Sequence, residues 1–303
     1  MTNTPMFSSK IYHKILYTRL LIKIIYKEIK SKKITTRLAR QNNIKTLPEL
    51  DLKHKVNSDT LFILGSGSSI NELNNAQWEK IEQNNSIGFN FWLIHDFVPT
   101  FFCYEEPSNE NERKNIFYTI LDQKKENLSK TPIIAKDLLD RSISFSRIPR
   151  SLFPNFYLSY DFDIPIRGRD DVMNLSLEIL ARSRRICKAS GLSFLYGYTA
   201  SLSYLIFFAL ACGYDNIVLC GVDLNNSMYF YEENKDYYRS KGIIVPKSVQ
   251  PQGCHSTNVR TKKKVPIDKV ISSINEKMLV PNKTKLWVAK RSSALYPYLP
   301  CFF

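Results

Sequence analysis

Several features that define familiar protein classes are missing from this chain of 303 residues. Its six cysteines form no C-x-x-C pair and no zinc-ribbon spacing, and some stand in apolar runs as Cys220 does, which favours a reducing, cytoplasmic setting. The sequence has no G-x-S-x-G hydrolase elbow and no Gly-Lys-[Ser/Thr] P-loop. No apolar run reaches the roughly 18 residues that a membrane span needs. With 44% hydrophobic and 23% charged residues, the composition is that of a folded globular protein.

Positive charge is concentrated at one end of the chain. The formal net charge is +15, and residues 1–40 hold ten Lys or Arg against one acid, Glu28. Residues 11–29 alternate these cations with apolar runs of no more than three residues, too short for a signal peptide. Two interpretations stay open: an amphipathic helix on the anionic inner face of the cell membrane, or a basic helix packed on its own domain. The Arg-rich, aromatic-interleaved signature of a nucleic-acid module is absent beyond this segment, so no nucleic-acid partner is expected.

The rest of the sequence alternates short apolar runs with helical patterns. Strands are expected at 61–65, 86–90, 100–104, 132–135, 216–221 and 285–289, and helices over 71–84, 107–130, 171–182, 199–211 and 266–278. This order predicts an α/β fold with a mainly parallel, Rossmann-like sheet flanked by helices.

Three further segments complete the expected organisation. The polar residues 41–58 are interpreted as a linker and 141–170 as irregular, while 224–264 are too long for a plain connector and predict a lid or substrate loop. The chain is thus divided into a basic N-terminal segment with linker, 1–57, and a larger domain, 58–303.

Two loops at expected strand ends have the composition of a nucleotide site. Gly65-Ser-Gly-Ser-Ser-Ile70 directly follows a strand, and its glycines would let backbone N–H groups approach a phosphate or ribose. A structural tight turn is the alternative. Asp223 follows another strand, where open α/β sheets bind ligands and a carboxylate can accept a bond from a ribose hydroxyl. Its alternative is an Asp that caps the next turn.

Histidines and paired carboxylates supply the remaining candidates. Of four histidines, His255 alone stands in a polar loop before a helix, where an imidazole could act as general base; a solvated loop histidine is the alternative. His95 lies among large apolar residues and is interpreted as part of the core. Asp161-Phe-Asp163 superficially matches the D-x-D metal clasp of nucleotide-sugar transferases, but metal binding is the less favoured interpretation.

Taken in order, these motifs resemble the bacterial sialyltransferases of glycosyltransferase family 42 over about residues 60–295. The loop at 65–70 is similar to the family's Gly-Asn-Gly-Pro-Ser-Leu, Phe89-Asn90 to its Cys-Asn, and Ser159-Tyr-Asp-Phe162 to its Gly-Tyr-Asp-Phe. Residues 199–223 resemble its Thr-Ser-Gly helix followed by Gly-Tyr, a strand and Gly-Ile-Asp. Gly253-Cys-His255-Ser resembles the Gly-His-Ser loop that carries the family's catalytic histidine.

The resemblance implies a GT-A-like variant of the fold and an inverting transfer from a CMP-activated sugar, with no metal or other cofactor. The sugar would be sialic acid or a related nonulosonic acid, and the acceptor a surface glycan or lipooligosaccharide. His255 would be the catalytic base, with Tyr229 or Tyr231 hydrogen-bonded to the departing phosphate; Ser201 would approach the sialic carboxylate and Asp223 the ribose. The donor-site residues that it implies are Gly65, Ser66, Gly67, Ser68, Asn90, Thr199, Ser201, Asp223, Leu224 and Asn225. An enzyme of this kind would lie peripherally at the inner face of the cell membrane, and homo-oligomer formation is left open.

The sequence departs from the family's pattern in three places. Glu105-Glu-Pro-Ser108 replaces an Asn-Pro-Ser, Tyr198 replaces an Arg, and Asn225 stands where the first of two tyrosines would lie. A carboxylate that faces an anionic donor repels it, so the transferred sugar stays open, including a ketose-type donor. Two other classes also stay open: a Rossmann-like methyltransferase or pyrophosphokinase, and a non-catalytic, membrane-associated glycan-binding or nucleotide-binding protein. Asn90 lacks the acidic group of an adenosine-ribose site, which counts against the first.

Overall fold

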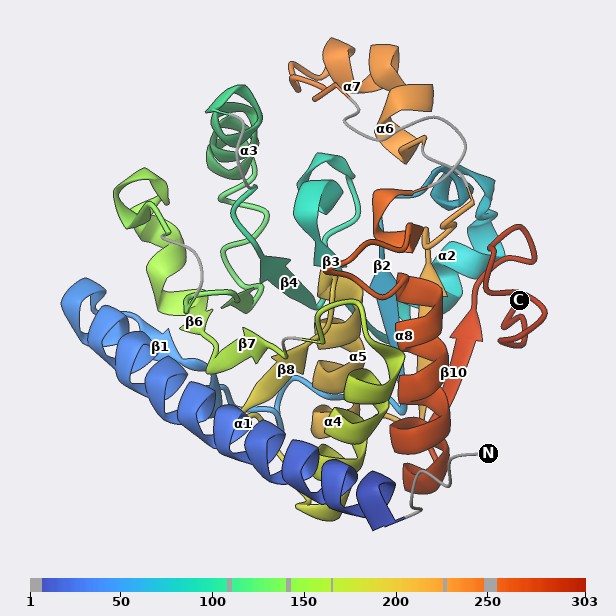
Figure 1. Ribbon diagram of the computed structural model, residues 1–303. Helices are drawn as coiled ribbons and strands as arrows, with labels where there is room; N and C mark the ends of the chain where they lie inside the picture. Colours follow the sequence, from blue (N-terminus) through green and yellow to red (C-terminus); the bar gives the residue numbers. More distant parts are fainter. Residues whose placement is uncertain (1–6, 108–110, 140–142, 165, 226–227, 248–254) are drawn as a thin grey trace.

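A sheet of eight strands, parallel throughout, runs through the molecule (Figure 1). The computed structural model describes residues 7–107, 111–139, 143–164, 166–225, 228–247 and 255–303. The strands, in their spatial order, are β1 (Lys45–Thr46), β6 (Phe156–Leu158), β5 (Ile133–Ala135), β4 (Phe101–Tyr104), β3 (Asn85–Phe89), β2 (Thr60–Leu64), β9 (Asn216–Cys220) and β10 (Lys285–Val288). A separate parallel pair joins β7 (Asp161–Asp163) to β8 (Leu195–Gly197). The predicted α/β, Rossmann-like class is confirmed.

Helices cover both faces of the sheet, because its central strands are apolar on both sides. In β2, Leu61 and Ile63 pack into one core and Phe62 and Leu64 into the other, as the two-residue period of a strand requires. The first core is closed by α1 (Phe7–Asn42), α4 (Asp170–Arg182), α5 (Ser201–Cys212) and α8 (Ile267–Ile274). The second is closed by η3 (Asn90–Ile94), α2 (Asn75–Glu82) and α3 (Asn111–Gln123).

The most apolar helix of the sequence, α5, occupies the centre of the first core. Residues 202–211 are all buried, so the helix is apolar around its whole circumference. It ends at Gly213, whose φ of 97° is the left-handed C-cap that glycine accommodates. The start of α5 is thereby held at the carboxyl edge of the sheet, beside β4 and β9.

The strand order fixes where a ligand site can form. From β2 the chain runs outward through β3, β4, β5 and β6, and then returns to the other side of β2 to form β9 and β10. The direction of winding therefore reverses between β2 and β9. In open parallel sheets the loops at such a reversal separate, which leaves a crevice at the carboxyl ends of the two strands.

The expected linker is built into the fold instead. Within residues 41–58, β1 pairs with β6 at the sheet edge, and η1 (Leu47–Glu49) follows, with Leu47 fully buried. The prediction of a linker was wrong because these two elements depend on tertiary pairing and have no local pattern. The division at residue 57 stays a prediction. The helix before it, α1, packs on α4 and β7 (Figure 1).

Other expected segments are more ordered, or differently divided, than the sequence indicates. The irregular region holds η4 (Phe145–Arg147), η5 (Arg150–Asn155), β6 and β7. The expected helix over 71–84 is split into η2 (Ser68–Glu72) and α2, and that over 266–278 continues from α8 into η7 (Asn275–Leu279) and η8 (Val280–Asn282). None of the helices described in the structure has the length and apolar character needed to cross a bilayer.

The polar stretch expected as a lid contains three short helices. These are α6 (Phe230–Glu233), α7 (Lys235–Ser240) and η6 (Ser256–Asn258); residues 226–227 and 248–254 lie outside the described residues. Asp96, in the loop after η3, accepts bonds from Tyr237 (2.5 Å) and Lys241 (2.6 Å), and Gln123 of α3 bonds the carbonyl of Gly242 (3.2 Å). The segment that contains α7 is therefore hydrogen-bonded to the loop after η3 and to the end of α3.

Candidate functional site

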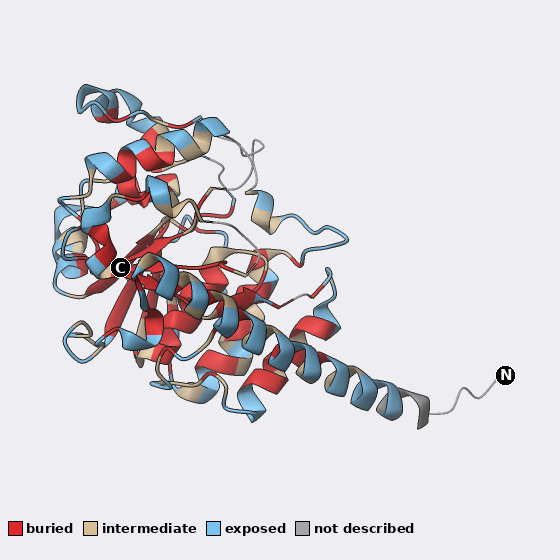
Figure 2. Cartoon of the chain, turned by 90° about the vertical axis from the view of Figure 1, so that its left-hand side faces the viewer, coloured by how far each residue is buried: buried red, intermediate tan, exposed pale blue. Residues whose placement is uncertain are grey.

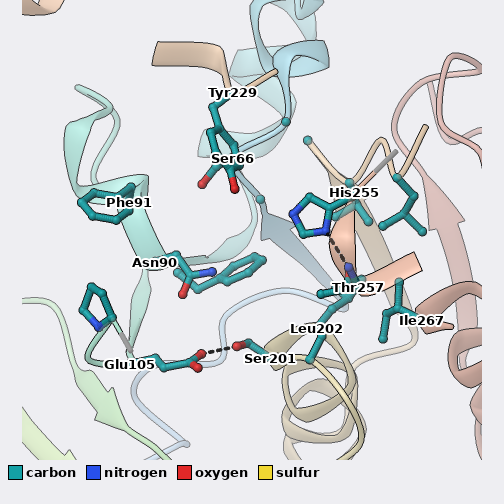
Figure 3. Close-up of a pocket in the computed structure, with 18 of the residues that line it drawn as sticks. Ser66, Asn90, Phe91, Glu105, Ser201, Leu202, Tyr229, His255, Thr257 and Ile267 are labelled. Carbon is teal, nitrogen blue, oxygen red and sulfur yellow. Dashed lines mark hydrogen bonds between the residues drawn. The ribbon is translucent and has the colours of Figure 1, made fainter. Parts of the chain in front are cut away.

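A cleft of about 390 Å³ opens at the reversal between β2 and β9. Figure 3 shows its wall: Ser66 and Tyr229 lie on one side, Glu105 and Ser201 opposite them, and Asn90 and His255 face one another across it. The residues expected from the sequence that line this cleft are Gly65, Ser66, Gly67, Asn90, Thr199, Ser201, Asp223, Leu224, Tyr229, Tyr231 and His255. Ser68 and Asn225 do not line it; the Asn225 amide donates to the carbonyl of Ser292 at 3.0 Å.

The glycines at 65 and 67 let two loops pack closely. A Cβ on Gly65 would lie 2.5 Å from the carbonyl oxygen of Gly221, and one on Gly67 would overlap the carboxylate of Asp223. The N–H groups of Gly65 and Gly67 donate to Cys220 O (2.8 Å) and Gly221 O (2.9 Å). These N–H groups are used inside the protein, so the expected approach to a phosphate was wrong for them. The structural alternative, a tight turn, explains both glycines.

Asp223 joins the same two loops. Its carboxylate accepts the N–H of Ser69 at 3.1 Å and the hydroxyl of the same residue, and its side chain is almost fully buried while still lining the cleft. Buried carboxylates need such donors to offset their lost hydration. Asp223 therefore holds the two loops of the cleft wall together. A ribose hydroxyl that bonded to its carboxylate would do so alongside the bonds from Ser69.

Left-handed backbone is gathered around the cleft. Asn90, Asp137, Thr199 and Leu224 line it, and their φ values are 55°, 64°, 60° and 61°. Residues other than glycine rarely adopt this region, and a β-branched threonine does so at a cost of order 1–3 kcal/mol. Such strain persists where the surrounding structure imposes it, and it is enriched at ligand sites. No residue pattern predicts this strain.

His255 enters the cleft from the loop before α8. Its ring Nδ1 lies 2.7 Å from Thr257 Oγ1 (Figure 3). Its backbone N–H donates to the carbonyl of Leu224 at 3.2 Å. Burial lowers the pKa of the imidazole below its ordinary 6.5. The ring is therefore neutral at pH 7. The Thr257 backbone N–H also lies 3.4 Å from Nδ1, which accepts it in the tautomer protonated on Nε2. The tautomer of a general base, with its lone pair on Nε2, requires instead that Nδ1–H donates to the Thr257 hydroxyl.

Two stacked tyrosines and an arginine form the wall near Ser66. The rings of Tyr229 and Tyr231 stack at 5.2 Å with planes 22° apart. Burial raises the pKa of the Tyr231 phenol well above 10, so this group stays a hydroxyl. The guanidinium of Arg113 lies 4.5 Å from the centre of the Phe91 ring and also lines the cleft. Sequence reasoning missed Arg113 because it lies within a polar helix with no motif.

The start of α5 carries a charged network that sequence reasoning also missed. The Ser201 hydroxyl donates to the carboxylate of Glu105, which also lies 3.4 Å from the Lys136 ammonium. Lys136 also donates to Asp137 at 2.6 Å and is almost fully buried. Burial alone would lower the pKa of Lys136, but the carboxylates of Glu105 and Asp137 raise it above its ordinary value. The position directly after β5, where parallel sheets place ligand-site residues, was the available signal for Lys136 and Asp137.

Asp161 and Asp163 are divided between core and cleft. Asp161 is buried and accepts the N–H of Asp137 at 2.8 Å; burial, with the nearby Asp137 charge, raises its pKa well above 3.8. Asp163 lines the cleft. In the part of the chain that the structure describes, no group of three or more His, Cys, Asp or Glu side chains is arranged to hold a metal ion.

The interpretation of His95 as a core residue is confirmed. Its ring stacks on Trp92 at 4.5 Å and on Trp78 at 5.1 Å, and Nδ1 accepts the N–H of Phe97 at 3.0 Å. Burial lowers its pKa to about 4. It lies away from the cleft and takes no part in the site.

Comparisons with known proteins give a distant likeness to solved structures. No protein-family model matches the chain, and no curated protein matches it. Among solved structures it is similar to the monofunctional alpha-2,3-sialyltransferase Cst-I from Campylobacter jejuni, with 16% identity over 82% of this chain and 81% of that one, and a TM-score of 0.42. A likeness at this level identifies neither a family nor a reaction, so the functional conclusion has to come from the cleft.

Proposed function

We propose that this protein is an inverting glycosyltransferase of the family 42 sialyltransferase type, which moves a nonulosonic acid or related sugar from a CMP-activated donor to a glycan acceptor. The observation that carries the proposal is the convergence at one cleft of His255, the Gly65–Gly67 turn and Ser201, which stand far apart in the sequence. These are the segments in which the sequence resembles the family. The strained backbone of four residues that line the cleft supports a ligand site there.

The proposed chemistry is a single displacement. The oxygen of an acceptor hydroxyl attacks the anomeric carbon, the bond from that carbon to the phosphate oxygen breaks, and CMP leaves with the electron pair. His255 Nε2 takes the acceptor's proton as the new bond forms. Because burial keeps the imidazole unprotonated at neutral pH, the base is in its active form there.

Charge that develops on the departing phosphate needs donors in the wall beside it. Tyr229 and Ser66 present hydroxyl groups there (Figure 3). Arg113 also lines the cleft, and its charge acts on the Tyr231 phenol. Asn225, expected at this position from the sequence, lies outside the cleft and is not part of the proposal. Since no metal is needed in this scheme, turnover should be the same with and without a chelator.

The proposal is tested with His255→Ala and, as a matched control, His54→Ala, which changes a histidine in an exposed loop. With CMP-linked acid sugars and an oligosaccharide acceptor, we expect kcat of His255→Ala to fall at least about 100-fold, as for loss of a general base. CMP affinity, measured by calorimetry, should change little, and the control should match the wild type.

Two results would overturn the proposal. One is wild-type turnover by His255→Ala. The other is a thermal shift of the wild type by S-adenosylmethionine or ATP in the absence of any shift by CMP, which would point to the methyltransferase or pyrophosphokinase class. The acid limb of the kcat profile gives a further check, because a base whose pKa is lowered by burial must lose activity at a pH below 6.5.

A further inference from the structure

The N-terminal helix α1 has two apolar faces, of which only one is covered. Leu20, Ile24, Ser31 and Thr35 face the domain and are buried. The hydroxyls of Ser31 and Thr35 bond the carbonyls of Asp161 (3.0 Å) and Ser159 (3.3 Å), so this face is anchored along its length. On this face the helix packs on its own domain, as one of the two interpretations of the sequence expected.

The opposite face is a stripe of exposed isoleucine. Ile11, Ile15, Ile22 and Ile29 are spaced by whole helical turns, and between 46% and 65% of their surface is exposed. Two residues along an α-helix turn by about 200°, so the stripe through Ile22 lies directly opposite the buried stripe through residues 20 and 24. The remaining exposed apolar side chains of the helix flank it: Tyr12, Ile25 and Tyr26. Figure 2 shows this outer face along the edge of the molecule.

Exposed cations lie beside the stripe and continue along the helix beyond its end. All of the following are exposed: Lys14, Arg19, Lys23, Lys30, Lys32, Lys33, Arg37 and Arg40. Burial together with the charges of Arg167 and Lys27 lowers the pKa of Lys23, which shows how crowded the positive charge is. The helix thus combines exposed apolar side chains with exposed positive charge.

We propose that the exposed face of α1 lies in the surface of an anionic lipid bilayer, parallel to the membrane. The isoleucines enter the boundary between headgroups and acyl chains, and the cations contact the lipid phosphates. Each cation near such a surface strengthens binding by about fivefold. This inference does not depend on the proposed function, because binding to vesicles is measured without turnover.

Other partners suit this surface less well. In a dimer of two such helices the exposed cations would face one another, and like charges would oppose association. A nucleic acid would pair with the cations but would leave the isoleucine stripe in water, whereas a lipid surface accommodates both. The charge and the apolar stripe together therefore favour lipid.

The test is co-sedimentation of the full chain with vesicles, either of phosphatidylcholine alone or of equal parts phosphatidylcholine and phosphatidylglycerol. We expect binding to the anionic vesicles only. The triple variant Ile15→Gln, Ile22→Gln, Ile29→Gln should bind at least about tenfold more weakly. Its matched control, Val98→Gln, Ile244→Gln, Val280→Gln, changes equally exposed apolar residues elsewhere and should bind as the wild type.

A second pair of variants tests the charge. Lys30→Gln, Lys33→Gln, Arg37→Gln should also weaken binding at least about tenfold, and Lys53→Gln, Lys80→Gln, Lys130→Gln should not. The changed side chains are exposed, so thermal unfolding should stay near that of the wild type.

Three results would overturn the inference. In the first, the wild type leaves anionic vesicles unbound. In the second, the isoleucine variant binds them as well as the wild type does. In the third, the isoleucine variant abolishes a wild-type dimer seen by analytical ultracentrifugation, which would assign the face to a second copy of the chain.

Discussion

At the residue scale, Glu105 places a carboxylate at the start of α5, where a helix N-terminus would otherwise favour a ligand's anion. Ser201 donates its hydroxyl to this carboxylate, and Lys136 is held between two acids. The Glu105 carboxylate therefore lies beside Ser201, where the resemblance to family 42 places the carboxylate of sialic acid. Donor selectivity should respond to this one residue.

The variant Glu105→Gln keeps the size of the side chain and removes its charge. With repulsion relieved and Lys136 left with one carboxylate, we expect KM for a CMP-linked sugar that carries a carboxylate to fall about fivefold or more relative to that for a neutral CMP-linked sugar. Steady-state kinetics on the two donors measures this ratio. Glu79→Gln, at an exposed position of α2, is the control. Equal changes for both donors would show that Glu105 is structural only.

His95 gives a second prediction, for stability. Its folded-state pKa of about 4 lies below the ordinary 6.5, since burial opposes its charge more than the Asp96 carboxylate favours it, while Lys124 and Lys241 oppose it too. As pH falls from 6.5 towards 4, the unfolded chain binds a proton that the folded one does not. Protonation of His95 in the unfolded chain therefore lowers the free energy of unfolding by about 3 kcal/mol over this window, and it has no effect above it.

Urea unfolding of His95→Phe between pH 7 and pH 4 tests whether His95 causes this loss of stability on acidification. The variant loses the bond from Phe97 N–H and should be about 1 kcal/mol less stable at pH 7, yet its stability should decline less on acidification. His54→Gln, at an exposed site, should follow the wild type. Parallel acid profiles for His95→Phe and the wild type would contradict the assignment.

At the element scale, α1 is fixed to the domain by a polar contact near its middle. Glu28 bonds Arg185 (2.8 Å) and accepts the hydroxyl of Tyr196 (2.7 Å), and both groups are largely shielded from water. Burial, with the Glu28 charge, raises the pKa of this phenol. Glu28→Gln should weaken both bonds and lower the free energy of unfolding by about 1–3 kcal/mol. Chemical denaturation measures the loss, and Glu82→Gln, an exposed change in α2, should leave stability unchanged.

Elements with a strong local pattern could be predicted, and those formed by pairing could not. Six strands were found because apolar runs such as Leu61–Leu64 are buried on both faces. The strands β1, β6, β7 and β8 have two or three residues each, and only their neighbours define them. The same holds at the cleft: the loops after β2, β3 and β9 were found by position, whereas Arg113 lies within a helix that has no motif. The N–H groups of Gly65 and Gly67 were expected from the sequence to face a phosphate. Their acceptors, the carbonyls of Cys220 and Gly221 at the end of β9, could not be foreseen because they are distant in sequence.

At the scale of the whole molecule, the two candidate binding surfaces carry opposite charge. The net charge of +15 is concentrated in α1, while the described wall of the cleft holds five carboxylates and two cations: Glu105, Glu106, Asp137, Asp163 and Asp223 against Arg113 and Lys136. A nucleotide in this cleft must gain its affinity from hydrogen bonds and packing, because the local charge repels it. The two surfaces should therefore differ in their response to salt.

The last prediction follows from this contrast. When NaCl rises from about 50 to about 500 mM, screening should weaken binding to anionic vesicles at least tenfold, because attraction across α1 is reduced. The same screening reduces repulsion at the cleft, so CMP affinity should stay level or increase. Co-sedimentation and calorimetry on the same preparation give both quantities. If CMP affinity fell with salt as steeply as vesicle binding, the nucleotide would be bound on the basic surface and not in the cleft between β2 and β9.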